Sequence, residues 1–563
     1  MSGSGHGSLW DTLSSVRDLG RIQEIAVVLL RYGFGDVAAR VGMTGALEKA
    51  GRLLRMEHAD QYLTMPTPER LRRTLQDLGP TFIKFGQILS TRVDLLPPEY
   101  LRELGQLQNN VPALDFELLR PQVRQDLGCE PEDIFARIDT VPLAAASLAQ
   151  THRAWLADGT ALVLKIRRPG IREVVEADLR LLARLADIAE ARAPDLRRYH
   201  PVEVVRQFTA SLRNELDFAA ECRNAERIAA NFAGHPEIVV PAVVWPLTSE
   251  RLNVQEFVGA IPGADIAAVE AAGLDRAQLA RSGANIVLKM VLEDGLFHAD
   301  PHPGNIFYLP DGRIAVIDFG MVGHVNAQRR GQVARLLYGL VAQRPEDVAD
   351  ILIDWAGQAE VDEARLQADI DEMIDQYRGL ALKDLHMGRM LLGVSALLRQ
   401  HALVLPGDLA LMIKAFLTLE GLGRLLDPDF DMASEARPFL ERAMLQRYSP
   451  RRLAKRGQRA LAGSLDLLED LPRELRRMLR RYGQGKFKLE VTSLRPFGNQ
   501  VAHAVNRLTM GIITAALIVG SSIVIDSGGV ASRFRTVLGL GGFIGAGLCG
   551  VVLLVWILRS GRR

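Results

Sequence analysis

Residues 297–320 read FHADPHPGNIFYLPDGRIAVIDFG, and this stretch decides how the rest of the chain is interpreted. It contains an H-x-D-x-x-x-x-N frame at 298–305, then an Asp-Gly turn, the apolar run IAVI and a D-F-G motif. This pattern predicts a β-hairpin between the two motifs. Phosphoryl transfer requires an acid beside the γ-phosphate, with an amide and a second carboxylate that hold Mg²⁺ between the phosphates. We therefore predict a nucleotide-phosphate site in which Asp300 and Asn305 are catalytic, and Asn305 and Asp318 bind the metal.

The composition is that of a globular protein. The 563 residues are 48% hydrophobic and 24% charged, which excludes general disorder and allows more than one domain. The three cysteines lie far apart and form no C-x-x-C motif, so we expect neither a disulfide framework nor a zinc cage, but a reducing compartment. The first residues lack a cationic region followed by an apolar core, so we expect no cleavable signal peptide.

The C-terminal part combines a basic segment with two charge-free runs. Residues 447–488 hold 13 Lys and Arg against four acids, although the whole chain has a net charge of only +1. This segment directly precedes the most apolar part of the chain, which favours membrane lipids over nucleic acid as its partner. The runs at 509–525 and 537–558 would form helices of roughly 25 and 33 Å, against ~30 Å for a hydrocarbon core. We therefore predict a transmembrane helical hairpin.

Flanking residues predict how this hairpin is oriented and what it contacts. Arg507 and Arg559 lie at its outer ends, which by the positive-inside rule places both ends and the large N-terminal domain in the cytoplasm. We thus expect a protein of the inner, cytoplasmic membrane. Small residues at four-residue spacing, such as Gly541 and Gly545, predict a homo-oligomer contact through these helices.

Upstream, residues 134–170 have the strand–loop–strand–turn–strand order that begins the N-lobe of a protein kinase. The third strand, ALVLKI, carries Lys165 where a lysine for the α- and β-phosphates is expected. The loop after the first strand is rich in alanine, which reaches positive φ only at a cost, so it must hold phosphates differently from a glycine-rich loop. The candidate contacts are the backbone amides of this loop and one hydroxyl, from Ala144, Ala145, Ala146 and Ser147.

A charged, alanine-rich helix is predicted at 214–232, and it supplies acids for Lys165. Asp217 and Glu221 are four residues apart and share a face, whereas Glu215 points elsewhere. One acid of this helix is expected to pair with the lysine, as a helix glutamate does in kinases. The residues alone leave open which acid it is.

The stretch LNVQEFVGAIPG at 252–263 is expected to be a strand that runs into the hinge between the two predicted lobes. There the backbone at Glu256 and Val258 is expected to bind the adenine. This assignment depends only on the order of the parts along the chain. No A-P-E motif follows Gly320, and a helical region is expected at 327–445, which favours a non-protein substrate.

Together these parts resemble the UbiB family of atypical kinases, the membrane-associated kinase-like proteins required for ubiquinone (coenzyme Q) biosynthesis. The resemblance covers about residues 20 to 440, and a terminal hairpin is a feature of many members. No motif position departs from the family, and the motifs together are very specific. They are the K-x-G-Q motif at 84–87, the AAAS loop at 144–147, Glu215-x-Asp217 and HADPHPGN at 298–305.

The resemblance implies that the helices carrying Lys84 and Gln87 fold across the active site, in space that a protein substrate would occupy. Lys84 would then pair with the acids Glu215 and Asp217. These four residues would be regulatory, because the arrangement would prevent phosphorylation of proteins in trans.

The resemblance also implies that Glu221 pairs with Lys165 in the nucleotide site. It implies ATP and Mg²⁺ as cofactors, with slow ATP hydrolysis coupled to lipid or to the ubiquinone-biosynthetic enzymes. Quinone precursors or those enzymes would be the partners. Two other functions stay open, a nucleotide-sensing scaffold with little turnover and a small-molecule phosphotransferase, although the latter leaves the K-x-G-Q motif unexplained.

The predicted fold class is α+β, a protein-kinase-like two-lobe fold with an N-terminal helical K-x-G-Q extension and a C-terminal transmembrane helical hairpin. The expected divisions are a flexible N-terminus (1–20), the helical extension (21–130), the N-lobe with the alanine-rich loop (131–262), the C-lobe (263–445), a basic juxtamembrane segment (446–506) and two transmembrane helices (507–559).

Overall fold

The structure of the chain is a computed structural model. It describes residues 16–40, 65–93, 95–107, 111–192, 197, 200–356, 361–378, 386–401, 403, 405–447, 515–516, 518–519 and 544–545. The chain divides into two compact units, Met1–Ala454 and Lys455–Arg563, and every helix and strand named below belongs to the first.

Helices come first in the chain. They are α1 (Val16–Arg31), α2 (Gly35–Arg40), α5 (Thr67–Leu78), α6 (Pro80–Thr91), α7 (Pro98–Leu104), α8 (Phe116–Leu127) and α9 (Pro131–Ile134). Proline lies in the first turn of α5, α6, α7 and α9, where its missing N–H costs no hydrogen bond. Gly79, at φ 94°, makes the turn between α5 and α6. Leu75 and Phe82 on either side of this turn share one buried core.

The sheet of the first lobe carries Lys165. Its strands are β1 (Phe135–Ile138), β2 (Ala144–Ala145), β3 (Ala149–Leu156), β4 (Ala161–Arg167) and β6 (Leu252–Glu256). They follow the order β1-β3-β4-β6, with β2 paired to β3, and all neighbours are antiparallel. Leu162, Leu164 and Ile166 of β4 are buried in one core with residues of α8. Because side chains alternate along a strand, Lys165 points to the opposite face.

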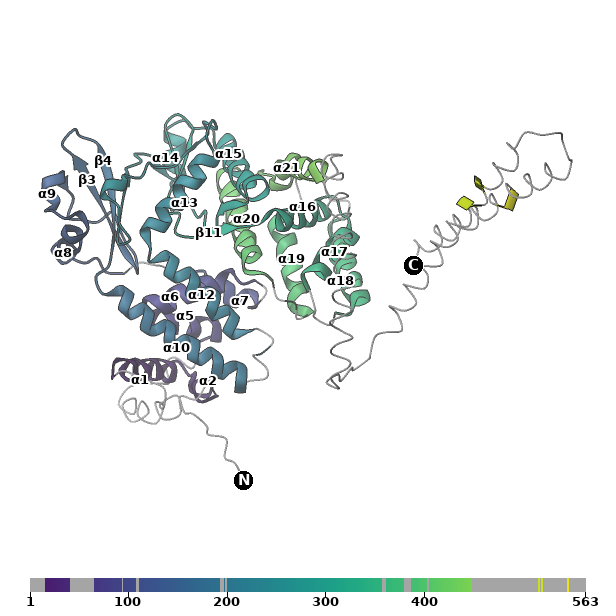
Figure 1. The fold of residues 1–563 in the computed structure, drawn as a ribbon, viewed down its shortest axis with the longest axis horizontal. Helices are drawn as coiled ribbons and strands as arrows, with labels where there is room; N and C mark the ends of the chain where they lie inside the picture. The colour runs from purple at the N-terminus through teal and green to yellow at the C-terminus, as the bar shows by residue number, and fades with distance from the viewer. Residues whose placement is uncertain are drawn as a thin grey trace, which may run out of the picture. The chain divides into compact units, whose positions relative to one another are not determined.

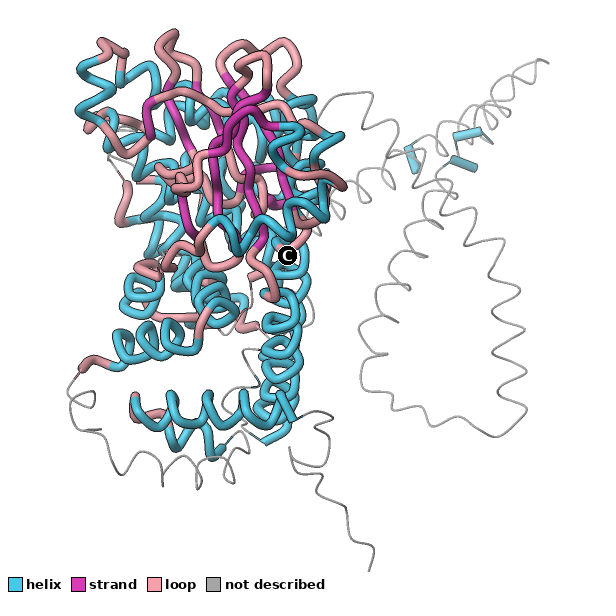
Figure 2. The backbone as a smooth tube through the Cα atoms, turned by 90° about the vertical axis from the view of Figure 1, so that its left-hand side faces the viewer, coloured by secondary structure: helices cyan, strands magenta, loops and turns pink. Residues whose placement is uncertain are grey.

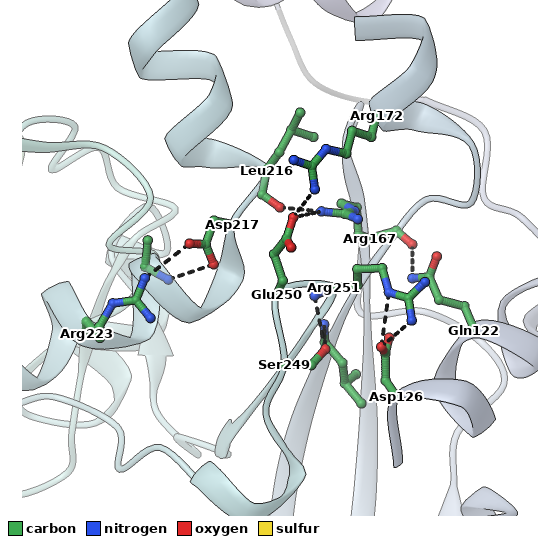
Figure 3. A network of polar contacts seen from close by, with 12 residues as sticks. Gln122, Asp126, Arg167, Arg172, Leu216, Asp217, Arg223, Ser249, Glu250 and Arg251 are labelled. Atoms are coloured by element: carbon green, nitrogen blue, oxygen red, sulfur yellow. Dashed lines mark hydrogen bonds and ion pairs between the residues drawn. The ribbon is translucent and has the colours of Figure 1, made fainter. Parts of the chain in front are cut away.

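A polar network fixes the next helices to the end of β4. These helices are α10 (Ile171–Arg192), α12 (Pro201–Glu215) and α13 (Phe218–Asn231). Arg167 donates to the carbonyl oxygen of Leu216 at 2.7 Å and lies 3.1 Å from Glu250, which also pairs with Arg172 (Figure 3). Leu216 is in the junction between α12 and α13. The start of α13 is therefore fixed relative to the strand that carries Lys165.

Short strands of the second lobe flank the loop at 298–305 that is predicted to be catalytic. They are β5 (Ile238–Val239), β7 (Ile261–Pro262), β8 (Leu296–His298), β9 (Ile306–Tyr308), β10 (Ile314–Val316) and β11 (Val322–His324). One sheet has the order β5-β10-β9-β7, and β8 pairs with β11. The predicted hairpin is present as the antiparallel pair β9–β10, with Gly312 at φ 84° in its turn.

Helices make up most of the second lobe. They are α14 (Ile266–Ala271), α15 (Arg276–Lys289), a π-helix at Met290–Asp294, α16 (Ala327–Val341), α17 (Pro345–Ala356), α18 (Glu363–Asp375), α19 (Met387–Gln400), α20 (Gly407–Leu426) and α21 (Met432–Arg447). Figure 1 shows α16–α21 gathered together, with α20 packed against α15. Figure 2 shows the strands in one half of this unit, and a purely helical part next to them. Phe297, Phe319 and Phe416 meet in the large core of this lobe.

The predicted fold class needs one correction. The prediction of a C-terminal transmembrane hairpin is wrong. No helix in the described part of the chain is long and apolar enough to cross a membrane. Most of 507–559 lies outside the described residues, which there include only 515–516, 518–519 and 544–545. The prediction rested on missing charge, which measures hydropathy and not helix formation.

Candidate active site

A buried histidine shapes the catalytic loop between β8 and β9. His298 accepts a hydrogen bond at Nδ1 from the backbone amide of Asp300 (3.0 Å), so the other ring nitrogen carries the proton. That nitrogen, Nε2, donates to the carbonyl oxygen of Ile317 at 3.1 Å. Burial lowers the pKa of His298, which keeps the ring neutral near pH 7. One imidazole thus ties the loop of Asp300 to the residue before Asp318.

Asn305 lies between the two predicted acids of the site. Its Nδ2 donates to the carbonyl oxygen of Asp300 at 3.3 Å, and its own carbonyl oxygen accepts from the amide of Ile317 at 2.9 Å. These bonds place the Asn305 side chain beside the strand that leads to Asp318. The side-chain oxygen, Oδ1, is the group that would bind a metal.

Asp318 has an unusual backbone and an exposed carboxylate. Its φ of 60° is in the left-handed region, which costs an L-residue roughly 1–2 kcal/mol. Such conformations cluster at functional sites. Partial loss of hydration among the surrounding side chains opposes its ionisation, but Lys165 and then Lys84 outweigh this effect and hold the pKa of Asp318 below its ordinary value. The side chain is 46% exposed and ionised at neutral pH, as a metal ligand must be.

Lys165 is paired with two of the predicted acids. Its Nζ lies 2.8 Å from both carboxylate oxygens of Glu221 and 3.2 Å from Oδ1 of Asp318. Burial lowers the pKa of Lys165, but Asp318 and Glu221 outweigh burial and raise it above its ordinary value. Burial, with help from Asp318, raises the pKa of Glu221 to about 7 despite the nearby ammonium. The next residue, Cys222, is 1% exposed, and burial raises the pKa of its thiol to about 12.

The K-x-G-Q helix α6 brings a second lysine to the same cluster. Lys84 forms an ion pair with Glu215, the last residue of α12. Gly320 shows how closely the acids gather. A Cβ atom on Gly320 would lie 3.2 Å from Oδ1 of Asp318, 3.8 Å from Oε2 of Glu221 and 3.9 Å from Cγ of Glu215. Three carboxylates and two ammonium groups therefore meet at the D-F-G motif.

The remainder of the K-x-G-Q motif packs α6 in place. Gln87 donates from Nε2 to the carbonyl oxygen of Leu107 at 2.9 Å. Gly86 allows a close approach, because a Cβ atom there would lie 2.8 Å from the Leu75 side chain and closer still to that of Leu107. In the structure Gln87 thus contacts the chain beyond α7, while Lys84 contacts the site.

Asp217 has a different place from its neighbour in the Glu215-x-Asp217 motif. It is the N-cap of α13, where its side chain accepts from the amide of Ala220 at 3.1 Å. It also pairs with Arg223 at 3.1 Å (Figure 3). The structure brings Glu215 to Lys84 and uses Asp217 to begin the helix that carries Glu221. The predicted helix at 214–232 has Asp217 in its interior, whereas α12 ends at Glu215 and α13 begins at Phe218.

The donor set suits a magnesium ion shared with phosphates. Mg²⁺ prefers hard oxygen ligands and is commonly held by one or two carboxylates together with substrate phosphates. Asn305 and Asp318 offer such oxygens, and the surrounding carboxylates outnumber the ammonium groups. Within the described residues, no group of three or more His, Cys, Asp or Glu is arranged to hold a metal by itself.

Comparisons with known proteins agree with this geometry. The chain matches the ABC1 atypical kinase-like domain at 106–352, the UbiB helical domain at 370–431 and the ABC1/UbiB kinase-like C-terminal domain at 492–559. It is 37% identical over 440 residues to a probable protein kinase UbiB of Aliivibrio salmonicida, covering 77% of this chain and 81% of that protein. It is 37% identical over 454 residues to a protein of the same description from Pseudomonas aeruginosa, covering 79% and 84%.

The chain belongs to the UbiB family of atypical kinases. This membership and the geometry support a kinase-like enzyme. A solved structure, the complex of Rv3197 with erythromycin from Mycobacterium tuberculosis, is 23% identical and covers 68% of this chain and 99% of that one, with a TM-score of 0.37.

In this UbiB protein the alanine-rich loop is a tight hairpin. β2 pairs with β3, and the amide of Ala146 donates to the carbonyl oxygen of Ala149 at 2.8 Å. Arg168 donates to the carbonyl oxygen of Ala146 at 2.9 Å. Hydrogen bonding, and not the conformational freedom of glycine, thus shapes this loop. Its predicted phosphate contacts differ in exposure, since Ala144 is exposed, Ala145 and Ala146 are half-buried and Ser147 is buried.

The predicted hinge follows β6. The amide of Glu256 donates to the carbonyl oxygen of Ala242 at 2.9 Å, and the amide of Phe257 donates to Ala161 at 3.0 Å. In the described part of the chain the amide of Val258 has no hydrogen-bond partner. Of the two residues predicted to contact adenine, Val258 therefore offers a backbone donor, while the Glu256 donor is already used.

One charged residue beside Asp300 belongs to none of the predicted motifs. Lys414 of α20 lies 2.7 Å from Oδ1 of Asp300, and both side chains are about three-quarters buried. A lysine inside the apolar run LALMIKAFLTL is a local signal, because an unpaired charge is costly there. The contact itself depends on how α20 packs against β11 and α6, which no local pattern predicts.

Proposed function

We propose that this protein binds Mg-ATP between its two lobes and transfers the γ-phosphoryl group to water or to a hydroxyl, in support of ubiquinone biosynthesis. The observation that carries the proposal is one ammonium, Lys165, within 2.8 Å of Glu221 and 3.2 Å of Asp318. Active kinases need the lysine–glutamate pair and the D-F-G aspartate in place together. Membership of the UbiB family supports the same kind of chemistry.

Each side chain has a separate task in this proposal. Lys165 neutralises charge on the α- and β-phosphates, and Glu221 orients its ammonium. The oxygens of Asn305 and Asp318 would hold Mg²⁺, which when bound supplies positive charge to the phosphate oxygens. Asp300 is the base that accepts the proton of the acceptor. The buried His298 fixes the backbone of Asp300 by accepting a hydrogen bond from its amide.

The proposed reaction balances without any redox partner. The acceptor oxygen forms a bond to the γ-phosphorus, while the bond between that phosphorus and the oxygen bridging to the β-phosphate breaks. The electron pair of the broken bond leaves with ADP. The proton of the acceptor moves to the carboxylate of Asp300 and from there to solvent.

We further propose that the protein works at the cytoplasmic face of the inner membrane. The basic segment at 447–488 supports this location, since anionic lipids attract such segments by about 1 kcal/mol per Lys or Arg near the surface. The family motifs support quinone precursors or the biosynthetic enzymes as partners. Membrane fractionation before and after a high-salt wash tests this, and a protein found only in the soluble fraction at low salt would contradict it.

The experiment for the proposed activity compares the full chain with two variants. Wild type is expected to hydrolyse ATP in a Mg²⁺-dependent manner, faster with vesicles that contain anionic lipid. Asp300→Ala should bind ATP and hydrolyse almost none. Arg437→Met is the control, because Arg437 is exposed on α21 and pairs only with Glu441 in the described residues. Its turnover should equal that of wild type.

Two outcomes separate the proposal from its alternatives. Nucleotide binding by wild type with no turnover under any lipid condition would favour a nucleotide-sensing scaffold. Full turnover in Asp300→Ala would remove Asp300 from the mechanism. In a strain that lacks the gene, the quinone profile should recover with wild type and not with Asp300→Ala, and normal quinone levels without any copy would refute the biosynthetic role.

A further inference from the structure

An ammonium group from a distant helix stands beside the predicted catalytic base. Nζ of Lys414 lies 2.7 Å from Oδ1 of Asp300. Its chain neighbours Ile413 and Ala415 are buried at 1% and 0%. A charge among such residues destabilises the fold unless it is paired, so an apolar side chain would serve packing better. The position of Lys414 is therefore explained by its partner in the site.

Residues 298–305 contain neither lysine nor arginine. Lys165, on the other side of the site, is engaged by Glu221 and Asp318. During phosphoryl transfer, negative charge spreads over the three equatorial oxygens of the γ-phosphoryl group, and cations placed at these oxygens stabilise the transition state. Among the described residues, the ion pair of Asp300 is with Lys414 of α20, which brings an ammonium group to that side of the site.

We propose that Lys414 is a catalytic residue that binds the γ-phosphate and stabilises the charge of the transferring phosphoryl group. This inference rests on the proposed transfer from ATP. An ammonium group has three N–H donors, so Lys414 can keep its contact with Asp300 while it donates to a γ-phosphate oxygen. It stays protonated throughout. The acceptor proton goes to Asp300, and the electron pair of the broken P–O bond leaves with ADP.

Contacts with the helical extension hold α20 for this task. Arg92, just after α6, donates to the carbonyl oxygen of Leu405 at 3.5 Å, shortly before α20 begins. Arg399 of α19 donates to the carbonyl oxygen of Val93. α20 also packs against β11, which follows the D-F-G motif. Lys414 is thus fixed to the K-x-G-Q helix and to the metal side of the site together.

The test compares ATP with ADP, because the two nucleotides differ only in the γ-phosphate. Binding of each with Mg²⁺ is measured by calorimetry for wild type, Lys414→Met and Lys414→Arg, and turnover is measured in parallel. Lys414→Met should bind ATP about 10-fold more weakly, bind ADP within twofold of wild type, and turn over about 10²-fold more slowly. Lys414→Arg, which restores the charge, should recover part of both losses.

The controls separate a catalytic role from a structural one. Arg437→Met removes one charge from α21 and should match wild type in all three measurements. Melting temperatures show whether each variant is folded, and Lys414→Gln replaces Lys414→Met if the latter does not fold. Equal losses for ATP and ADP would overturn the inference, as would unchanged turnover. A rise in turnover would also overturn the inference, and it would show that Lys414 inhibits Asp300 through their ion pair.

The same data distinguish this inference from the proposed function. If wild type neither binds nor hydrolyses ATP, the proposed function fails, and the inference fails with it. If wild type hydrolyses ATP and Lys414→Met does so at the same rate, only the role of Lys414 is refuted.

Discussion

Two groups of charged side chains face the predicted phosphate site, and they differ in their balance of charge. The roof cluster consists of Lys84, Lys165, Glu215, Glu221 and Asp318, in which three carboxylates meet two ammonium groups. The floor pair consists of Asp300 and Lys414, in which one carboxylate meets one ammonium. The roof cluster thus has an excess of negative charge, whereas the floor pair is neutral.

This difference indicates separate tasks for the two groups. The side chain of Asp318 is 46% exposed, so its carboxylate can bind a cation from solvent. The roof cluster is therefore the group that we expect to bind the metal. The floor pair already contains its cation and needs only an acceptor proton to change its charge. Removal of one acid from each group should therefore affect different steps, and the following predictions are ordered by the expected size of the effect.

The largest effect is expected for Asp318→Asn. The substitution keeps the shape of the side chain and removes the excess charge of the roof cluster, so Mg²⁺ loses its carboxylate ligand. Turnover should fall by about 10³-fold or more, and the affinity for Mg-ATP should fall with it. Titration of Mg²⁺ at a fixed ATP concentration measures both. If Mg-nucleotide binding remains that of wild type, the metal assignment is wrong.

Asp300→Asn should break the floor pair and spare the roof cluster. The variant loses the base but keeps the backbone bond to His298. We expect turnover to fall by about 10²- to 10⁴-fold while the affinity for Mg-ATP stays within a few-fold of wild type. Steady-state kinetics combined with calorimetry checks the split. A loss of affinity as large as that of Asp318→Asn would show that the two groups are not functionally separate.

Glu221→Gln should weaken the roof cluster and change its response to pH. Loss of a charge-assisted hydrogen bond to Lys165 should lower turnover roughly 10- to 100-fold. In wild type the raised pKa of Glu221, about 7, means that the carboxylate gains a proton as the pH falls below 7 and releases Lys165. Turnover should therefore decline on the acid side of pH 7. This decline should be absent from the pH–rate profile of Glu221→Gln, and its persistence there would assign it to another group.

The smallest effect is expected in the alanine-rich loop, because the substitution there changes no charged side chain. Ala146→Gly frees the backbone of a hairpin that is now held by Ala149 and Arg168, at a cost of roughly 0.5–1 kcal/mol. The ratio of ATP to ADP affinity should change by a few-fold. Ala267→Gly, at an exposed position of α14, is the matched control and should leave that ratio unchanged. If the ratio of ATP to ADP affinity is the same in both variants, the loop does not contact the nucleotide.

The roof cluster could largely be predicted from the sequence, because its members belong to motifs in a fixed chain order. Lys165 was found from its strand and Asp318 from D-F-G, and the family resemblance selected Glu221 among the neighbouring acids. The pairing of Lys84 was only partly specified, since Glu215 contacts it and Asp217 caps α13 instead. Motif order indicates which residues approach one another, whereas the pairs themselves depend on helix packing.

Only one member of the floor pair could be predicted from the sequence. Asp300 belongs to a loop motif, but Lys414 is a single lysine on a helix and reaches the site through tertiary packing. The transmembrane prediction rested on hydropathy alone, and no helix in the described part of the chain is long and apolar enough to cross a membrane. Local patterns were sufficient where backbone geometry fixes the outcome, as in the β9–β10 hairpin.

Cys222 offers a chemical reporter for the opening of this site. The thiol follows Glu221 directly, is 1% exposed and has a pKa of about 12, so almost none of it is thiolate at neutral pH in the closed protein. An alkylating reagent should therefore modify only those molecules in which α13 has swung away from the sheet. In a chain with Cys129 and Cys549 replaced by serine, the alkylation rate would report how often α13 moves away from the sheet. A bound nucleotide that closes the lobes would lower this rate.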